Sequence, residues 1–159
     1  MHRTRNDLST RTRNKVTTLL SERLTDSVAL RLAVKQAHWN VKGPGFMQLH
    51  ELFDEIAGRI DGHADELAER ITALGGVAFG TAAVAAVSRI GRYPDNVFEG
   101  RAHLAELADR IAALAKSTRA GIGAAVQAGD EVTADLFNAV TGALDKDLWL
   151  LEAHLQADR

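Results

Sequence analysis

Histidine and carboxylate side chains that could bind a metal ion lie in two short segments of the chain. The first segment, HWNVKGPGFMQLHELFD (38–54), contains His38, His50 and Asp54, and the second, DELAE (65–69), contains Asp65 and Glu69. On an α-helix, with about 100° between successive residues, the four side chains from His50 to Glu69 share one face in two pairs. Eleven residues, about 16 Å of helical rise, separate the pairs. One helix therefore cannot bring all of them to one metal centre.

A two-fold axis would bring the two pairs together. If this helix packs antiparallel against its own copy, residues whose numbers share one sum face each other. His50 with Glu69 gives 119, and so does Asp54 with Asp65. The pattern therefore predicts two equivalent sites in each dimer, with every site built from both copies.

Small residues surround the centre of this predicted axis, which falls between residues 59 and 60. Ala57, Gly58 and Gly62 lie there, and glycine inside a helix costs about 1 kcal/mol relative to alanine. We therefore expect a packing reason, the close approach of two helices. His38, at the end of the preceding helix, would complete the set of ligands.

The predicted site offers two nitrogen and three oxygen ligands and no sulfur. This set suits Fe(II), and Zn(II) or Mn(II) would also fit. The alternative is a solvated helix face whose charges merely repeat every four residues, but His50 and the mirror-symmetric spacing argue against it. The chain also has no Glu-x-x-His motif, which closes a di-iron site within one chain. That absence agrees with a shared site.

Helical spacing and chain breaks predict the elements that carry these residues. Apolar residues recur at helical intervals over 8–37, Gly43-Pro44 breaks the chain, and Pro44 suits the first turn of the next helix. Asn96 and Glu99 resemble a capping box before a later helix. We predict an all-α four-helix bundle with a long crossover between the second and third helices, as in ferritin-like folds. Its helices span about 8–37, 44–74, 96–127 and 131–155, with a short helix near 81–88.

Length and composition set the limits. The 159 residues suit one domain, and 46% hydrophobic with 25% charged residues is typical of a soluble globular protein. There are no cysteines, so disulfides and thiolate ligands are excluded. No apolar run is long enough to cross a bilayer, and nothing resembles a secretory signal. We expect a cytoplasmic protein without a membrane partner.

The first residues are strongly basic, although the whole chain has a net charge of −2. We expect residues 1–14 to form a mobile arm ahead of a bundle domain at 15–159. Such an arm is either a frayed, solvated end or a contact for the phosphates of DNA, and many arms on one particle would bind DNA through avidity. The basic residues within the arm are Arg3, Arg5, Arg11 and Arg13, and Lys15 follows directly after it.

The segments 38–54 and DELAERITALGG (65–76), with DKDLWLLEAHL in the last helix, resemble the Dps family, the mini-ferritins named as DNA-binding proteins from starved cells. The resemblance runs from about residue 15 to the end. Position by position, it implies that His38, His50 and Asp54 are ferroxidase ligands from one subunit. Asp65 and Glu69 would come from the two-fold mate. Trp39 resembles the tryptophan beside the centre in many relatives, and a core aromatic is the alternative.

The resemblance also implies a hollow dodecamer that oxidises Fe(II) with hydrogen peroxide or dioxygen, two irons per site and no organic cofactor. It would store ferric oxide and protect DNA. Two alternatives are a sequence-independent nucleoid DNA-binding protein in which iron oxidation is secondary, and a plain helical scaffold. Glu131 and Asp135, with Asp130 less favoured, would line three-fold pores and draw Fe(II) inward. The alternative is that these acids only stabilise the start of the helix through its dipole. Glu51 and Glu55 would nucleate mineral or be plain surface acids.

Overall fold

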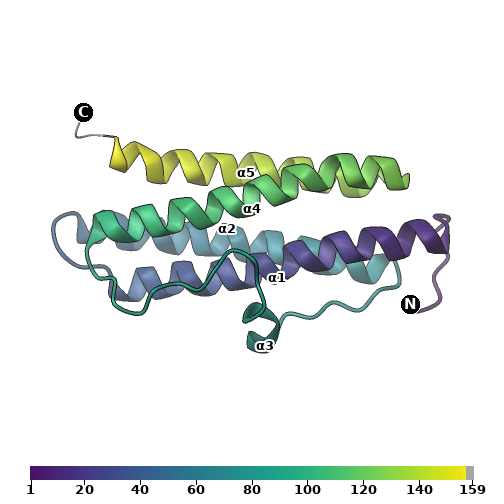
Figure 1. Cartoon of the computed structure of the whole chain (residues 1–159), viewed down its shortest axis with the longest axis horizontal. Coiled ribbons are helices and arrows are strands. Elements are labelled where there is room, and N and C mark those ends of the chain that lie inside the picture. The colour runs from purple at the N-terminus through teal and green to yellow at the C-terminus, as the bar shows by residue number, and fades with distance from the viewer. Residues whose placement is uncertain (157–159) are drawn as a thin grey trace.

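The computed structural model, which describes residues 1–156, is built from four long helices and one short one (Figure 1). Helices α1 and α2 form one antiparallel hairpin and α4 and α5 a second, and the two hairpins pack side by side. A long crossover with the short α3 links them, and the described residues contain no strand. The predicted all-α four-helix bundle with a crossover is confirmed. The helices are α1 Thr10–Asn40, α2 Phe46–Ala73, α3 Ala82–Ala85, α4 Gly100–Ala128 and α5 Glu131–Leu155.

The core fixes which way α2 faces. Its residues Leu49, Phe53, Ile56, Ile60 and Leu67 are all buried, and they recur every three or four positions except for one longer step. Two hydrophobic clusters, one at each end of the bundle, receive them. Because one face of α2 is committed to this core, its opposite face carries polar residues and is free for contacts outside the chain.

Helix α2 begins at Phe46, two residues later than expected. Pro44 lies in a turn between Gly43 and Gly45, whose φ angles are +95° and +76°. Such positive angles favour glycine over any residue with a Cβ. The prediction that Pro44 opens the helix is therefore wrong, because the left-handed Gly45 is the N-cap.

The predicted capping box before α4 is also wrong. Glu99, in an extended conformation, is itself the N-cap, and its carboxylate accepts hydrogen bonds from the backbone N–H groups of Arg101 and Ala102. The N–H of Lys42 donates to the carbonyl of Phe98 at 2.9 Å. This bond places the start of α4 beside the loop that leads into α2.

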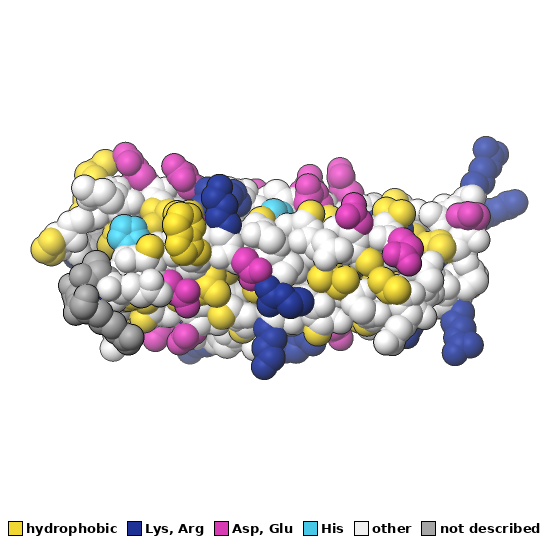
Figure 2. Space-filling model, turned by 90° about the horizontal axis from the view of Figure 1, so that it is seen from above, with side chains coloured by type: hydrophobic (Ala, Val, Ile, Leu, Met, Phe, Trp, Pro, Cys, Tyr) yellow, Lys and Arg dark blue, Asp and Glu magenta, His cyan; other side chains and the backbone are white. Residues whose placement is uncertain are grey.

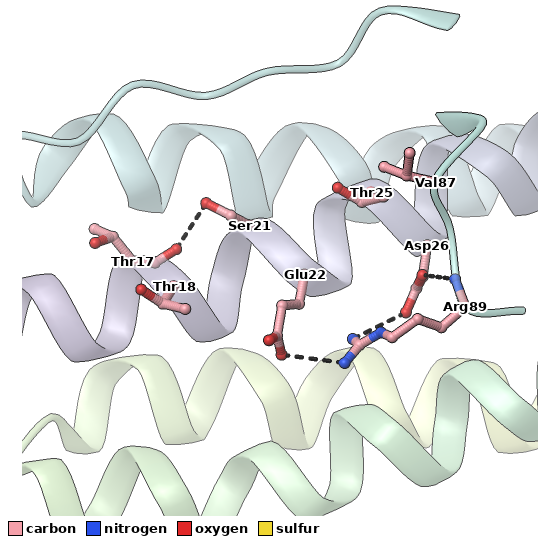
Figure 3. Close-up of a pocket in the computed structure, with 8 residues that line it drawn as sticks. All are labelled: Thr17, Thr18, Ser21, Glu22, Thr25, Asp26, Val87 and Arg89. Carbon is pink, nitrogen blue, oxygen red and sulfur yellow. Dashed lines mark hydrogen bonds and ion pairs between the residues drawn. The ribbon is translucent and has the colours of Figure 1, made fainter. Parts of the chain in front are cut away.

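The buried Asp26 of α1 pins the crossover. Figure 3 shows its carboxylate turned toward the loop, where Oδ1 accepts from the Ser88 hydroxyl at 2.8 Å and the Arg89 N–H at 2.9 Å. The Arg89 guanidinium spans from Asp26 to Glu22. The open pocket of about 450 Å³ beside this clamp is lined by α1 hydroxyls, several of which donate to carbonyls of their own helix. The contacts among Asp26, Arg89 and Glu22 therefore have a structural role, which is to hold the crossover against α1.

Helix α1 begins inside the predicted arm. Ser9 caps it by accepting from the N–H of Thr12 at 3.1 Å, so the helix starts at Thr10, close to the expected start at residue 8, and residues 10–14 of the predicted arm are helical. Further back, the N–H of His2 donates to the carbonyl of Gly75 at 2.6 Å. The beginning of the chain therefore lies against the end of α2. No helix among the described residues is long and apolar enough to span a membrane.

Candidate metal centre

His38 and His50 form a reciprocal pair between the end of α1 and the start of α2. The Nδ1 atom of His38 lies 2.7 Å from the carbonyl oxygen of His50, and the Nδ1 of His50 lies 2.8 Å from the carbonyl oxygen of His38. Their rings stack with centroids 3.7 Å apart, and the ring of Phe46 packs on His50 at 5.1 Å. Each histidine thereby fixes the other.

These two hydrogen bonds determine the tautomer of each ring. A carbonyl oxygen only accepts, so Nδ1 must carry the proton in both His38 and His50. In a neutral imidazole the lone pair then lies on Nε2. Metal-binding histidines commonly donate their second ring N–H to a backbone carbonyl or carboxylate in this way. Both rings are therefore prepared to bind a cation through Nε2.

Asp54 faces a cation that the sequence analysis did not single out. The Lys35 ammonium of α1 lies 2.6 Å from Asp54 Oδ1, and this hydrogen bond holds the pKa of Asp54 below its usual range. Lys35 precedes His38 by three residues, close to one turn of the same helix, and that spacing was the available signal. In the free chain Lys35 provides the positive charge that a metal ion would bring.

Asp65 and Glu69 lie further along the same exposed face of α2, and both side chains are exposed. Among the described residues neither carboxylate has a hydrogen-bond or ion-pair partner, and no three His, Asp or Glu side chains gather as a metal site. One chain pairs His38 with His50 and holds Asp54, one turn further along α2, against Lys35. It leaves Asp65 and Glu69 about 16 Å away.

The surface between the two groups of ligands is bare. A Cβ added at Gly58 or Gly62 would meet nothing within 4 Å, and a shallow hollow of about 370 Å³ runs beside Gly62 and Asp65. Ala57 is buried in the core instead, so of the three small residues only the glycines lie on this surface. A second helix can approach α2 closely here.

Two arginine–aspartate pairs, neither expected from the sequence, hold α2 against α5. Arg59 Nε lies 2.8 Å from Oδ1 of the fully buried Asp147, and Arg70 Nη2 lies 2.8 Å from Oδ1 of the buried Asp130. Arg70 directly follows Glu69. The backbone that carries the second group of ligands is therefore anchored at its own end.

The two buried aspartates differ in pKa. Burial raises the pKa of Asp147, because the opposing Arg59 does not fully compensate and Oδ2 has no partner among the described residues. Burial also raises that of Asp130, but hydrogen bonds from the Thr133 hydroxyl and N–H, with Arg70, outweigh it and leave the pKa below its usual range. The two ion pairs are similar, but more hydrogen bonds reach the carboxylate of Asp130 than that of Asp147, and this explains the opposite directions of their pKa shifts.

The remaining predicted residues are spread over the surface. Trp39 is 68% exposed, with the Lys35 ammonium 5.8 Å from its ring centroid, so it is not a core aromatic. Glu51 and Glu55 are exposed, and Glu55 pairs with Arg59 at 3.5 Å.

The acids at the start of α5 separate into two kinds. Glu131 and Asp135 are exposed and remain candidates for a pore. Asp130 is 2% exposed, and its side chain caps α5 by accepting from the N–H of Thr133. Because Arg70 and Thr133 already occupy this carboxylate, the pore role predicted for Asp130 does not fit.

The basic residues near the N-terminus also separate into two kinds. Arg3, Arg5, Arg11 and Lys15 are exposed. Arg13, however, donates from Nη1 to the carbonyl of Leu74 at the end of α2, at 3.2 Å, where a cation suits the helix dipole. Arg11, Arg13 and Lys15 all belong to α1. This leaves Arg3 and Arg5 as the exposed cations ahead of the helix.

The four-helix bundle with its long crossover agrees with comparisons to known proteins. Residues 17–159 match the ferritin-like domain family. The DNA protection during starvation protein of Agrobacterium fabrum is 42% identical over 156 residues, which cover 98% of this chain and 96% of that protein.

Solved structures give the same result. The Mycobacterium smegmatis Dps structure in its tetragonal form is similar, with a TM-score of 0.91, 34% identity and coverage of 99% of this chain and 96% of that one. A Dps protein from Vibrio cholerae O1, described as a member of a broad superfamily of ferritin-like diiron-carboxylate proteins, has a TM-score of 0.90 at 27% identity, covering 98% of each chain. The chain belongs to the Dps family of ferritin-like proteins.

Proposed function

We propose that this chain is a ferroxidase whose sites form only between two copies, with α2 packed antiparallel on α2 of the mate. The observation that carries the proposal is the reciprocal His38–His50 pair, which leaves Nε2 of both rings ready to bind a cation. Beside it stand Asp54 on the same chain and the exposed pair Asp65 and Glu69. Asp65 and Glu69 of the mate would complete the ligand set of the first chain. In the antiparallel packing proposed, residues whose numbers sum to 119 face each other, so Glu69 would lie opposite His50 and Asp65 opposite Asp54.

The proposed chemistry follows from the donor set. His38 and His50 bind iron as neutral ligands, and the three carboxylates offset most of the charge of two Fe(II) ions. Peroxide or dioxygen takes electrons from the irons, one from each iron per peroxide, so the oxidant is reduced in a pairwise step without release of a hydroxyl radical. Lys35 leaves Asp54 as iron arrives. Zn(II) or Mn(II) would fit the same ligands.

We further propose that the sites belong to a closed dodecamer that stores the ferric product. Several large hydrophobic side chains are more than 60% exposed, including Phe79, Val87 and Trp149. Figure 2, which looks onto the α5 side, shows hydrophobic patches interspersed with acidic side chains. Such surfaces suit burial between copies. Glu131 and Asp135 would draw Fe(II) inward at three-fold pores, and Glu51 and Glu55 would face the mineral.

Anaerobic iron loading tests this proposal. Fe(II) is added without oxygen until binding saturates, then peroxide or air is added separately while ferric absorbance is recorded. We expect two Fe(II) per site and oxidation by at least one oxidant, in a particle whose mass is that of an assembly. Rapid oxidation by an isolated monomer would contradict the shared site.

A second candidate function is binding of DNA through the exposed Arg3 and Arg5 of each copy, which would make the protein nucleoid-associated in the cytoplasm. The name of the Agrobacterium fabrum relative, DNA protection during starvation protein, supports it. Such binding would contact phosphates without recognising bases, and it would weaken steeply with salt. The His2–Gly75 bond opposes it by keeping the arm against the body.

Gel retardation of plasmid DNA at low salt tests the second function. The double variant Arg3→Ser with Arg5→Ser should lose retardation, while the matched pair Arg92→Ser with Arg119→Ser, exposed arginines on other elements, should keep it. If the unmodified assembly fails to retard DNA at any salt concentration, this second function does not apply.

A further inference from the structure

The only tyrosine of the chain, Tyr93, is buried and paired with a buried histidine. Its hydroxyl lies 2.5 Å from Nδ1 of His103, which is 0% exposed. Tyr93 lies in the crossover before α4, and His103 lies in the first turn of α4. Burial raises the pKa of Tyr93 and lowers the pKa of His103, so both rings are neutral in the resting protein.

The direction of this hydrogen bond can be worked out from what each choice leaves unsatisfied. If Tyr93 donates to Nδ1, the only orphaned group is the His103 Nε2–H, which has no partner among the described residues. If His103 donated instead, the Tyr93 O–H and the Nε2 lone pair would both be orphaned. Since each buried unsatisfied group is costly, Tyr93 is the donor.

Two contacts tie this pair to the segments that carry the metal ligands. The ring of His103 meets the ring of Phe53 edge-on, with centroids 6.2 Å apart, and Phe53 directly precedes Asp54. The residue after Tyr93, Pro94, accepts a hydrogen bond from Gln36 at 3.3 Å, and Gln36 precedes His38 by two residues. The Tyr93–His103 pair therefore packs, through Phe53 and Gln36, against the helical segments that carry His38 and Asp54.

We infer that Tyr93 is a redox site that supplies one electron when hydrogen peroxide meets a centre holding a single iron. This inference rests on the proposed ferroxidase function. Peroxide needs two electrons to become two waters, and one Fe(II) supplies only one. The phenol O–H bond of Tyr93 breaks, its electron goes to the peroxide and its proton to His103 Nδ1. Fe(II), neutral Tyr93, neutral His103, peroxide and two solvent protons thus give Fe(III), a neutral tyrosyl radical, the His103 cation and two waters.

The surroundings favour the return of that proton. A His103 cation would stand in the core with its Nε2–H unpartnered, which is costly in an apolar environment. The proton is therefore held near the phenoxyl oxygen and restores Tyr93 when a later Fe(II) re-reduces it. The guanidinium carbon of Arg110 lies 5.1 Å from the centroid of the Tyr93 ring. The charge of Arg110 is offset by the Glu106 carboxylate, whose Oε2 lies 2.6 Å from Arg110 Nη1.

A purely structural role is the competing explanation. Arg110 also donates to the carbonyl of Arg92 at 2.5 Å, so Tyr93, His103 and Arg110 together fasten the end of the crossover to α4. That role requires no electron transfer. Trp39, exposed beside the ligands, is the competing electron donor within a redox explanation.

Electron paramagnetic resonance on the assembled protein separates these possibilities. Samples loaded with one Fe(II) per site are mixed with peroxide, frozen and compared with samples loaded with two. We expect an organic radical signal with one iron, falling several-fold with two irons, because the second iron then supplies the electron. Protein grown on ring-deuterated tyrosine should give a narrower signal, and since Tyr93 is the only tyrosine, this assigns the radical without any mutation.

Variants add a second check. Tyr93→Phe should abolish the deuterium-sensitive signal, whereas Trp39→Phe should keep it. If iron is oxidised but the signal is insensitive to ring deuteration or is lost in Trp39→Phe, the inference is wrong while the ferroxidase proposal stands. If no ferric absorbance develops in the same samples at either loading, the ferroxidase proposal itself has failed.

Discussion

The two groups of candidate ligands are prepared in different ways. His38, His50 and Asp54 are held by contacts within the chain: the rings fix each other through backbone carbonyls and Lys35 occupies the carboxylate. Asp65 and Glu69 have no side-chain partners among the described residues, although the adjacent Arg70 anchors their backbone to Asp130. This difference supports the proposed shared site, in which one group is a preformed half-site and the other is donated to a neighbouring copy.

The largest effect should come from the preformed half-site. His50→Ala removes a proposed ligand and also the Nδ1–H that donates to the carbonyl of His38 at the end of α1. Losing only a supporting partner of a metal ligand costs about 10- to 100-fold in metal affinity, so Fe(II) affinity should fall by more than that. Anaerobic titration measures it, with the exposed His154→Ala as the matched control. If both variants bind alike, His50 is not a ligand.

Removing the anchor behind the second group should act on stability. Asp130→Asn loses charge-assisted hydrogen bonds and should cost about 1.5–3 kcal/mol of unfolding free energy at neutral pH. Asp147→Asn should cost less, because Oδ2 of Asp147 is unpartnered and its charge is already disfavoured. Denaturant unfolding of both variants measures the difference. An equal loss in both would contradict the account of the anchors.

The pH dependence of that loss has a definite sign. The pKa of Asp130 is lower in the folded protein than in the unfolded chain, so its stabilisation is complete above the unfolded pKa and is lost as pH falls through the folded value. The gap between wild type and Asp130→Asn should therefore narrow in acid. A gap that widens in acid would reverse the assigned sign.

A smaller effect should follow from removing Lys35, the cation that pairs with Asp54 in the first group of candidate ligands. Lys35→Met removes the ammonium that competes with metal for Asp54, so Fe(II) affinity at low salt should rise roughly two- to fivefold, the size of an exposed ion pair. The pKa of Asp54 should return upward, moving the acid limit of binding to higher pH. Lys42→Met, the other lysine near this end, is the control. Weaker binding in Lys35→Met would show that Lys35 positions the site.

The sequence predicted the bundle well because helical periodicity and glycine breaks are local signals. It also predicted that the candidate ligands from His50 to Glu69 share one face of α2, which is the face turned away from the buried Phe53 and Ile60. It missed the start of α2 and the Glu99 cap, where loop geometry decides. It also missed Lys35, Arg59 and Asp147, whose roles depend on contacts between helices that no local pattern encodes.

The measurement that tests the shared site most directly is mixing of two defective proteins. His50→Ala and Asp65→Ala, each poorly active alone, are unfolded together, refolded, and assayed for Fe(II) oxidation after hetero-assembly is confirmed by mass. If sites combine His50 of one copy with Asp65 of the other, each mixed dimer holds one intact site. Random pairing then restores about a quarter of all sites. Recovery near that level is predicted, and no recovery in confirmed mixed assemblies would contradict the shared site.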